Sequence, residues 1–140
     1  VLNGIKATES DIVLIHDAAR ADIKKDDIIK VYQATKEHQA AFLAIKAVDT
    51  IKEEVNGFVH STLNRNVLWQ AQTPQGALRK TLITCLEQAS REGYYGFDDM
   101  ELLEKYADKK AKIVEGSSTN IKITNPEDFK IFEYFKKEGI

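Results

Sequence analysis

A histidine, an acid and a base follow a short apolar run near the start of the chain. Residues 12–15 are apolar, and His16, Asp17 and Arg20 come directly after them, with two alanines between the last two. A carboxylate in this place could hold a divalent metal ion, and an arginine could grip a phosphate through two N–H groups. An aspartate that caps the next helix, with an arginine on that helix's surface, fits the same spacing. The spacing alone leaves both interpretations open.

A second polar segment with a basic residue lies near the other end. Residues 117–120 are polar, and Lys122 and Thr124 alternate with isoleucines after them. In open α/β sheets, ligands bind beyond the carboxyl ends of the strands, where such residues would gather. A solvated loop with a surface lysine is the alternative. Composition and motifs alone therefore indicate no more than an α/β domain that handles phosphate.

The sequence does not indicate a zinc site, a cysteine nucleophile or a known nucleotide-binding or hydrolase motif. His16, His38 and His60 are scattered, with no spacing typical of a zinc site. Cys85 lies in the middle of an apolar helical stripe, so we expect it in the core rather than as a nucleophile. The chain carries no glycine-rich dinucleotide fingerprint, P-loop or nucleophile elbow.

Strands and helices alternate along the chain, which predicts how these residues are positioned. Asn56-Gly57, a strong hairpin signal, lies within residues 48–63, and we expect a projecting arm there. Residues 70–76 are expected to connect this arm to the next helix. We predict one α/β domain over residues 1–140, with a mostly parallel, Rossmann-like sheet and covering helices. The predicted strands are 11–17, 41–45, 111–115 and 120–124, and the predicted helices are 25–37, one beginning near 78, 98–107 and 126–138.

Composition narrows the class of protein. The 140 residues are 43% hydrophobic, and 20 basic residues nearly balance 22 acidic ones. That balance argues against a nucleic-acid partner, and no apolar stretch is long enough to span a membrane. A single cysteine, Cys85, suits a reducing, cytoplasmic location. The chain opens without methionine on what reads as the end of a helix, which would fit part of a longer protein.

Five segments, in this order, resemble the 2-C-methyl-D-erythritol 4-phosphate cytidylyltransferases of non-mevalonate isoprenoid biosynthesis. They are VLNGI (1–5), VLIHDAAR (13–20), VDTIK (48–52), RNVLWQAQTPQ (65–75) and VEGSSTNIKITNPED (114–128). The resemblance covers essentially the whole chain but only about the last two thirds of the family's usual length. It implies that the N-terminal part of the fold is missing, including a glycine-rich loop that wraps the nucleotide triphosphate. We therefore expect the 140 residues alone to be inactive.

The resemblance also implies the reaction and the residues that bind its substrates. The family joins CTP to the sugar-alcohol phosphate and releases pyrophosphate, with Mg²⁺ as cofactor. Asp17 would organise the metal and the reacting phosphates, and Ala18 would lie close to the nucleotide. Arg20 and Thr73 would bind the sugar phosphate.

Two further pairs of residues complete the implied site. Lys122 would position the attacking phosphate as a catalytic residue, with Thr124 beside it. Thr50 and catalytic Arg65, on a dimerisation arm over residues 48–66, would reach into the neighbouring subunit's site. A homodimer is therefore expected.

The chain departs from the family's pattern at two positions. Ala21 stands where a proline is usual, which would change backbone rigidity only. Phe97 replaces a threonine before Asp98 and Asp99, so one hydroxyl that contacts substrate is absent. Two other functions stay open: a pentitol-phosphate cytidylyltransferase acting on ribitol 5-phosphate, and a non-catalytic, dimerising remnant.

Overall fold

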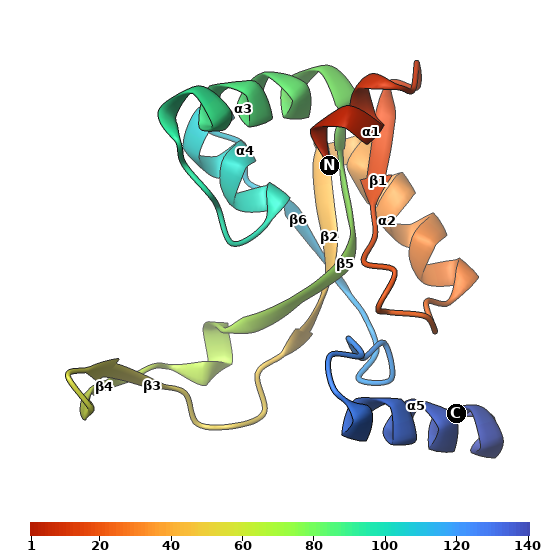
Figure 1. The fold of residues 1–140 in the computed structure, drawn as a ribbon, viewed down its shortest axis with the longest axis vertical. Coiled ribbons are helices and arrows are strands. Elements are labelled where there is room, and N and C mark those ends of the chain that lie inside the picture. The colour runs from red at the N-terminus through yellow and green to blue at the C-terminus, as the bar shows by residue number, and fades with distance from the viewer.

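Four strands form the main sheet of the computed structural model, which describes residues 1–140 (Figure 1). Their order across the sheet is β1–β5–β2–β6. The long central strand β5 runs antiparallel to both neighbours, whereas β2 and β6 pair in parallel. The strands are β1 (Ile12–Ile15), β2 (Ala40–Lys46), β5 (Trp69–Leu78) and β6 (Lys112–Glu115).

The expected α/β class is confirmed, but the sheet is mixed rather than mostly parallel. The difference comes from residues 70–76, expected as a connection, which lie within β5. This strand is buried through polar and small residues, among them Gln72, Gln75 and Gly76, so it has no apolar run to reveal it. Glycine is required at 76, because a Cβ there would lie 2.1 Å from the hydroxyl of Thr35 on the neighbouring helix.

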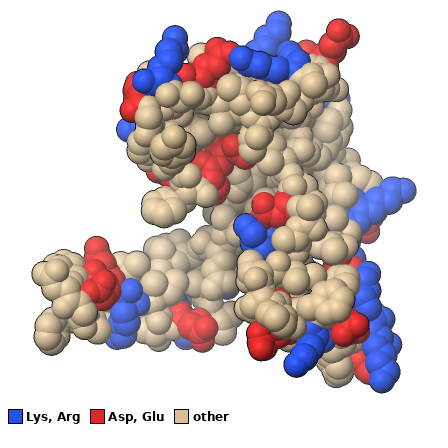
Figure 2. Space-filling model, viewed as in Figure 1, with Lys and Arg blue, Asp and Glu red and all other residues tan.

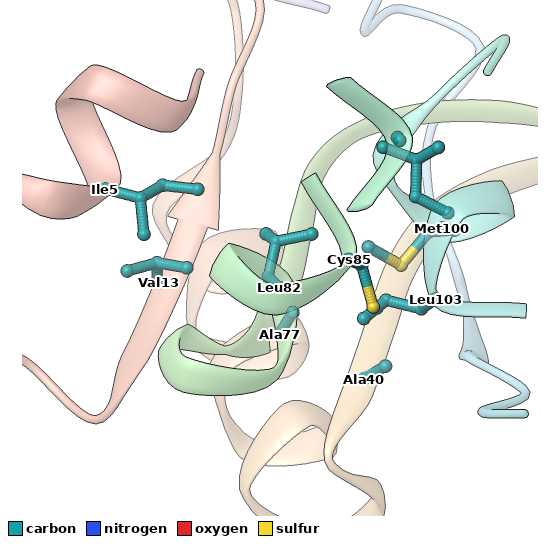
Figure 3. Close-up of a cluster of buried hydrophobic side chains, with 10 residues drawn as sticks. Ile5, Val13, Ala40, Ala77, Leu82, Cys85, Met100 and Leu103 are labelled. Atoms are coloured by element: carbon teal, nitrogen blue, oxygen red, sulfur yellow. The ribbon is translucent and has the colours of Figure 1, made fainter. Parts of the chain in front are cut away.

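Helices cover the two faces of this sheet. Helix α2 packs on β2, β5 and β6, whereas α3 lies on the other face with α4 and α1 against it. The main core fills that second layer and includes Leu82, Cys85 and Leu103 (Figure 3). Cys85 is therefore a core residue, as expected, and the predicted helices are confirmed to within a few residues. These four are α2 (Lys25–His38), α3 (Arg79–Glu92), α4 (Asp99–Ala107) and α5 (Pro126–Glu138), and a short helix α1 (Leu2–Lys6) lies where the end of a helix was expected.

The expected hairpin is present as a separate two-stranded sheet that projects from the body (Figure 1). It consists of β3 (Lys52–Val55) and β4 (Phe58–Thr62), and a short 3₁₀ helix, η1 (Arg65–Val67), follows it. Asn56 and Gly57 both have positive φ, 53° and 84°, as the predicted tight turn requires. Every side chain of β3 is exposed, so the arm has no core of its own.

Helix α5 also stands apart from the body (Figure 1). It begins with a capping box between Asn125 and Asp128, and none of its side chains is buried. Its C-terminal half is held by Lys136, which pairs with the buried carboxylate of Asp22. Residues 120–124, expected as a strand, form an irregular loop before this helix, because Ile123 donates its N–H to the Ala19 carbonyl rather than to a strand. All of the helices are too short or too polar to cross a bilayer.

Candidate functional site

Two loops meet beside the middle of β5 and form a charged cleft. One loop follows β1 and carries Asp17 and Arg20, and the other follows β6 and carries Lys122. Thr73 of β5 also lines the cleft, as do Asp98 and Asp99 at the start of α4. Acidic and basic side chains both face the hollow between the helical layer and the lower part of the molecule (Figure 2). The structure thus brings together the residues from both polar segments.

One carboxylate oxygen links the two cations of the cleft. Lys122 Nζ lies 3.1 Å from Asp17 Oδ2, and Arg20 Nε lies 3.6 Å from the same oxygen. The Lys122 side chain is half exposed at 49%, whereas that of Arg20 is only 12% exposed. Lys122 can therefore move toward a bound ligand, while Arg20 is fixed in the wall.

The guanidinium of Arg20 is buried with one donor unfilled. Its Nη1 donates to the Asn120 carbonyl at 2.7 Å, and its Nη2 faces the Ala71 carbonyl at 3.5 Å. Its Nε is buried and has no hydrogen-bond partner. Burial lowers the pKa of Arg20, and the neighbouring Asp17 opposes that effect. The ion pair between Arg20 and Asp17 is long at 3.6 Å, so a phosphate in the cleft would further stabilise the guanidinium charge.

Asp98 and Asp99 are site residues that the sequence reasoning had treated only as neighbours of Phe97. Asp98 caps α4 by accepting the Glu101 N–H at 2.8 Å, and it also accepts a hydrogen bond from Gln75 at 3.0 Å. Burial raises the pKa of Asp99, and the negative charges of Asp98 and Asp17 raise it further. Three carboxylates thus line the cleft together with Arg20 and Lys122. The helix cap was a visible signal, but nothing in the sequence placed α4 beside the loop that holds Asp17.

The residues of the cleft fit Mg²⁺ only if substrate phosphates and water supply most of its ligands. No group of three or more His, Cys, Asp or Glu side chains is arranged to hold a metal ion. Mg²⁺ commonly binds through one or two carboxylates while water and substrate phosphates fill its other positions. The half-buried Asp17 carboxylate suits that mode, because one side chain would suffice once phosphates are bound.

Four of the expected site residues lie outside the lining of this cleft. Ala18 is exposed on the first loop. The Thr124 hydroxyl donates to Asp128 at 2.7 Å and so serves the start of α5. Thr50 and Arg65 belong to the exposed arm region, where Arg65 donates to the Val48 carbonyl. Within one chain, the arm residues therefore have no part in the cleft.

Comparison with known proteins shows the family of this chain. The family described as 2-C-methyl-D-erythritol 4-phosphate cytidylyltransferase matches residues 1–138. The chain belongs to this family. A cytidylyltransferase of that name from Aquifex aeolicus is 44% identical over 131 residues, covering 94% of this chain and 61% of its own length. One from Prochlorococcus marinus is 45% identical over 141 residues, covering 99% and 63%.

Solved cytidylyltransferase structures agree in fold. The 4-diphosphocytidyl-2C-methyl-D-erythritol synthase from Anaerococcus prevotii matches with a TM-score of 0.90 and 31% identity, over 96% of this chain and 64% of that one. A 2-C-methyl-D-erythritol 4-phosphate cytidylyltransferase from Francisella tularensis matches with a TM-score of 0.84 and 30% identity, over 95% and 64%. The expected family is thus confirmed. The chain spans about three fifths of the length of the cytidylyltransferases it matches.

Proposed function

We propose that the full-length protein transfers the cytidylyl group of CTP to 2-C-methyl-D-erythritol 4-phosphate and releases pyrophosphate. The main support for this proposal is that Lys122 and Arg20 both form ion pairs with Asp17. The chain that holds them matches the cytidylyltransferase family from residue 1 to residue 138. Two cations and a carboxylate at one cleft suit a reaction between phosphates.

The chemistry explains why this cleft needs cations rather than a base. An oxygen of the sugar phosphate attacks the α-phosphorus of CTP in line, the new P–O bond forms, and the bond to pyrophosphate breaks. The attacking phosphate is already ionised near neutral pH, so no group has to remove a proton. The barrier comes from bringing negative groups together, and positive charges placed beforehand lower it. Lys122 and Arg20 supply those charges from this chain.

The two cations have different roles. Arg20 is fixed by backbone carbonyls and lines the cleft, so its guanidinium charge can attract the sugar phosphate from a fixed position. Lys122 is half exposed on its loop, and it is held only by Asp17. A mobile ammonium can follow the attacking phosphate as charge shifts to the α-phosphorus, which makes Lys122 the catalytic cation.

Asp17 is the residue that would hold Mg²⁺, and the metal would neutralise the triphosphate when bound. Asp17 also keeps Lys122 in the cleft until substrate arrives. Ala18, exposed beside Asp17, leaves room for the nucleotide, because its methyl group obstructs little. Thr124 supports this assembly by fixing the start of α5 directly after the Lys122 loop.

The arm completes the site in a homodimer. An isolated two-stranded hairpin is marginal in water, and this one exposes Phe58 at 76% and Val59 at 64%. Two copies can clasp such arms around a two-fold axis and bury these side chains. Thr50 and Arg65, which face no cleft of their own chain, would then approach the sugar phosphate of the partner subunit.

Product analysis of the full-length protein tests the proposal. We expect CTP, Mg²⁺ and 2-C-methyl-D-erythritol 4-phosphate to give pyrophosphate and a cytidine diphosphate product, detected by ³¹P NMR. Ribitol 5-phosphate, offered at the same concentration, should react much more slowly. Faster turnover of ribitol 5-phosphate would instead assign the pentitol reaction. No turnover of either acceptor would identify the non-catalytic module.

A further inference from the structure

His16 is an exposed residue next to the cleft, and both of its ring nitrogens contact residues that line the cleft. Nδ1 lies 2.9 Å from the hydroxyl oxygen of Thr73, and Nε2 lies 3.0 Å from the carbonyl oxygen of Arg20. The same Thr73 hydroxyl accepts the backbone N–H of Asp17 at 3.0 Å. These contacts connect the histidine with three residues of the cleft.

The proton positions follow from what each group can donate. A carbonyl oxygen only accepts, so the proton between His16 and Arg20 belongs to Nε2. In a neutral imidazole the other nitrogen is then an acceptor, so the Thr73 hydroxyl must donate to Nδ1. The chain of hydrogen bonds runs in one direction, from the Asp17 N–H through Thr73 to His16 and on to the Arg20 carbonyl.

These hydrogen bonds hold the loop from Asp17 to Arg20 at both of its ends. The turn between Asp17 and Arg20 has its own backbone hydrogen bond of 2.9 Å, and His16 joins that turn to β5 through Thr73. The Thr73 proton is used up in the process. While the chain is intact, Thr73 has no proton for a phosphate oxygen, and its contribution is to hold the Asp17 backbone.

We propose that His16 is a positioning residue, which fixes the loop bearing Asp17 and Arg20 through Thr73 and through the Arg20 carbonyl. Its neutral ring would carry the proton on Nε2, and the histidine takes no part in the transfer itself. The consequence for kinetics rests on the proposed function, whereas the hydrogen-bond arrangement does not. The phosphate-binding Arg20 is the residue that would be misplaced without it.

The hydrogen-bond arrangement is tested by ¹⁵N NMR on the full-length protein at mildly alkaline pH. We expect the His16 ring to show the Nε2–H tautomer, with its signal assigned by loss in His16→Asn. We also expect the Asp17 amide to exchange with solvent at least about tenfold faster in His16→Ala and in Thr73→Val. His38→Ala, at the exposed end of α2, is the matched control and should change neither signal. An Nδ1–H tautomer, or unchanged exchange at Asp17, would overturn the proposal.

The kinetic consequence is tested with amides that replace one ring nitrogen each. An asparagine at 16 can place an acceptor near the Nδ1 position, and a glutamine can place a donor near the Nε2 position. His16→Ala should raise the KM for the sugar phosphate about tenfold and change kcat and the KM for CTP less than about threefold, because the Arg20 carbonyl loses its partner whereas the Asp17 N–H keeps Thr73 as acceptor. His16→Asn and His16→Gln should each recover part of that loss.

Two outcomes separate a positioning role from a merely structural one. Parallel losses in kcat and in both KM values, without recovery by either amide, would show that His16 only stabilises the fold. If the wild-type protein forms no cytidine diphosphate product, the proposed transferase function fails. The NMR tautomer and the Asp17 exchange rate then still decide whether His16 holds the loop.

Discussion

Arg20 and Lys122 both pair with the Asp17 carboxylate, but their surroundings differ, so we expect their replacement to change different kinetic constants. Arg20 is buried among backbone carbonyls, so it can bind a ligand equally in the ground state and the transition state. Lys122 is half exposed and free to follow the reacting phosphate. An interaction made equally in both states affects KM, whereas one made only in the transition state affects kcat.

In the full-length protein, Arg20→Ala should therefore raise the KM for the sugar phosphate by about 10- to 100-fold, as expected for loss of a charge-assisted contact. Lys122→Ala should lower kcat while leaving both KM values within a few fold. Steady-state kinetics with each substrate varied in turn measure both effects. An intact kcat in Lys122→Ala, together with lost nucleotide binding in Arg20→Ala, would reverse the assignment.

The site residues were predictable from sequence only where a motif carried them. Asp17, Arg20, Thr73 and Lys122 were expected, and the structure places all four at one cleft. Asp98 and Asp99 were missed as cleft residues because their position depends on how α4 packs, which no local pattern encodes. The positioning role proposed for His16 was not predictable, because it depends on two hydrogen bonds that exist only in the folded loop.

Helix α5 is attached to the body through the buried carboxylate of Asp22, and Lys24 also contacts the Ile140 carbonyl just beyond the helix. Asp22 is 6% exposed and pairs with Lys136 and Lys24, whereas the helix buries no side chain of its own. Hydrogen bonds from these lysines lower the pKa of Asp22. The folded state thus binds this proton less tightly than the unfolded chain does. The resulting stability is present above the ordinary aspartate pKa of about 3.9 and is lost as pH falls.

Asp22→Asn should accordingly lower the free energy of unfolding by about 1–2 kcal/mol near neutral pH, since the lysines are half exposed. The difference from wild type should shrink as the pH falls below about 4, where the wild-type carboxylate also becomes neutral. Thermal unfolding followed across this pH range provides the measurement. Asp26→Asn, at an exposed position of α2, serves as the control. A deficit that stays constant with pH would exclude the ion pair as its cause.

At the level of elements, strong local signals were sufficient for the helices and the hairpin. The Asn56-Gly57 turn and the capped start of α5 were both predicted where they occur. Strand β5 was not, because its inner residues are polar or small and are buried by tertiary packing alone. That single strand changed the sheet from mostly parallel to mixed.

At the scale of the whole molecule, the exposed arm is the basis for the proposed homodimer. Phe58→Ser should raise the dimer dissociation constant by about 10- to 100-fold, because a buried phenylalanine contributes roughly 1.5–3 kcal/mol. Sedimentation equilibrium of the full-length protein measures this constant. Phe129→Ser, at a half-exposed aromatic residue on α5, should leave it unchanged. A wild-type protein that stays monomeric, or a Phe58→Ser protein that dimerises as wild type does, would contradict assembly through the arm.

Complementation in mixed dimers most directly tests a transferase site shared between two subunits. Full-length Arg65→Ala and Lys122→Ala proteins should each be nearly inactive alone. If Arg65 acts on the partner's cleft, mixing places both lesions at one site of the heterodimer and leaves the other site intact. With about half of the dimers mixed, activity should recover to roughly a quarter of wild type. No recovery after verified subunit exchange would show that every site carries a lesion, which contradicts the shared site.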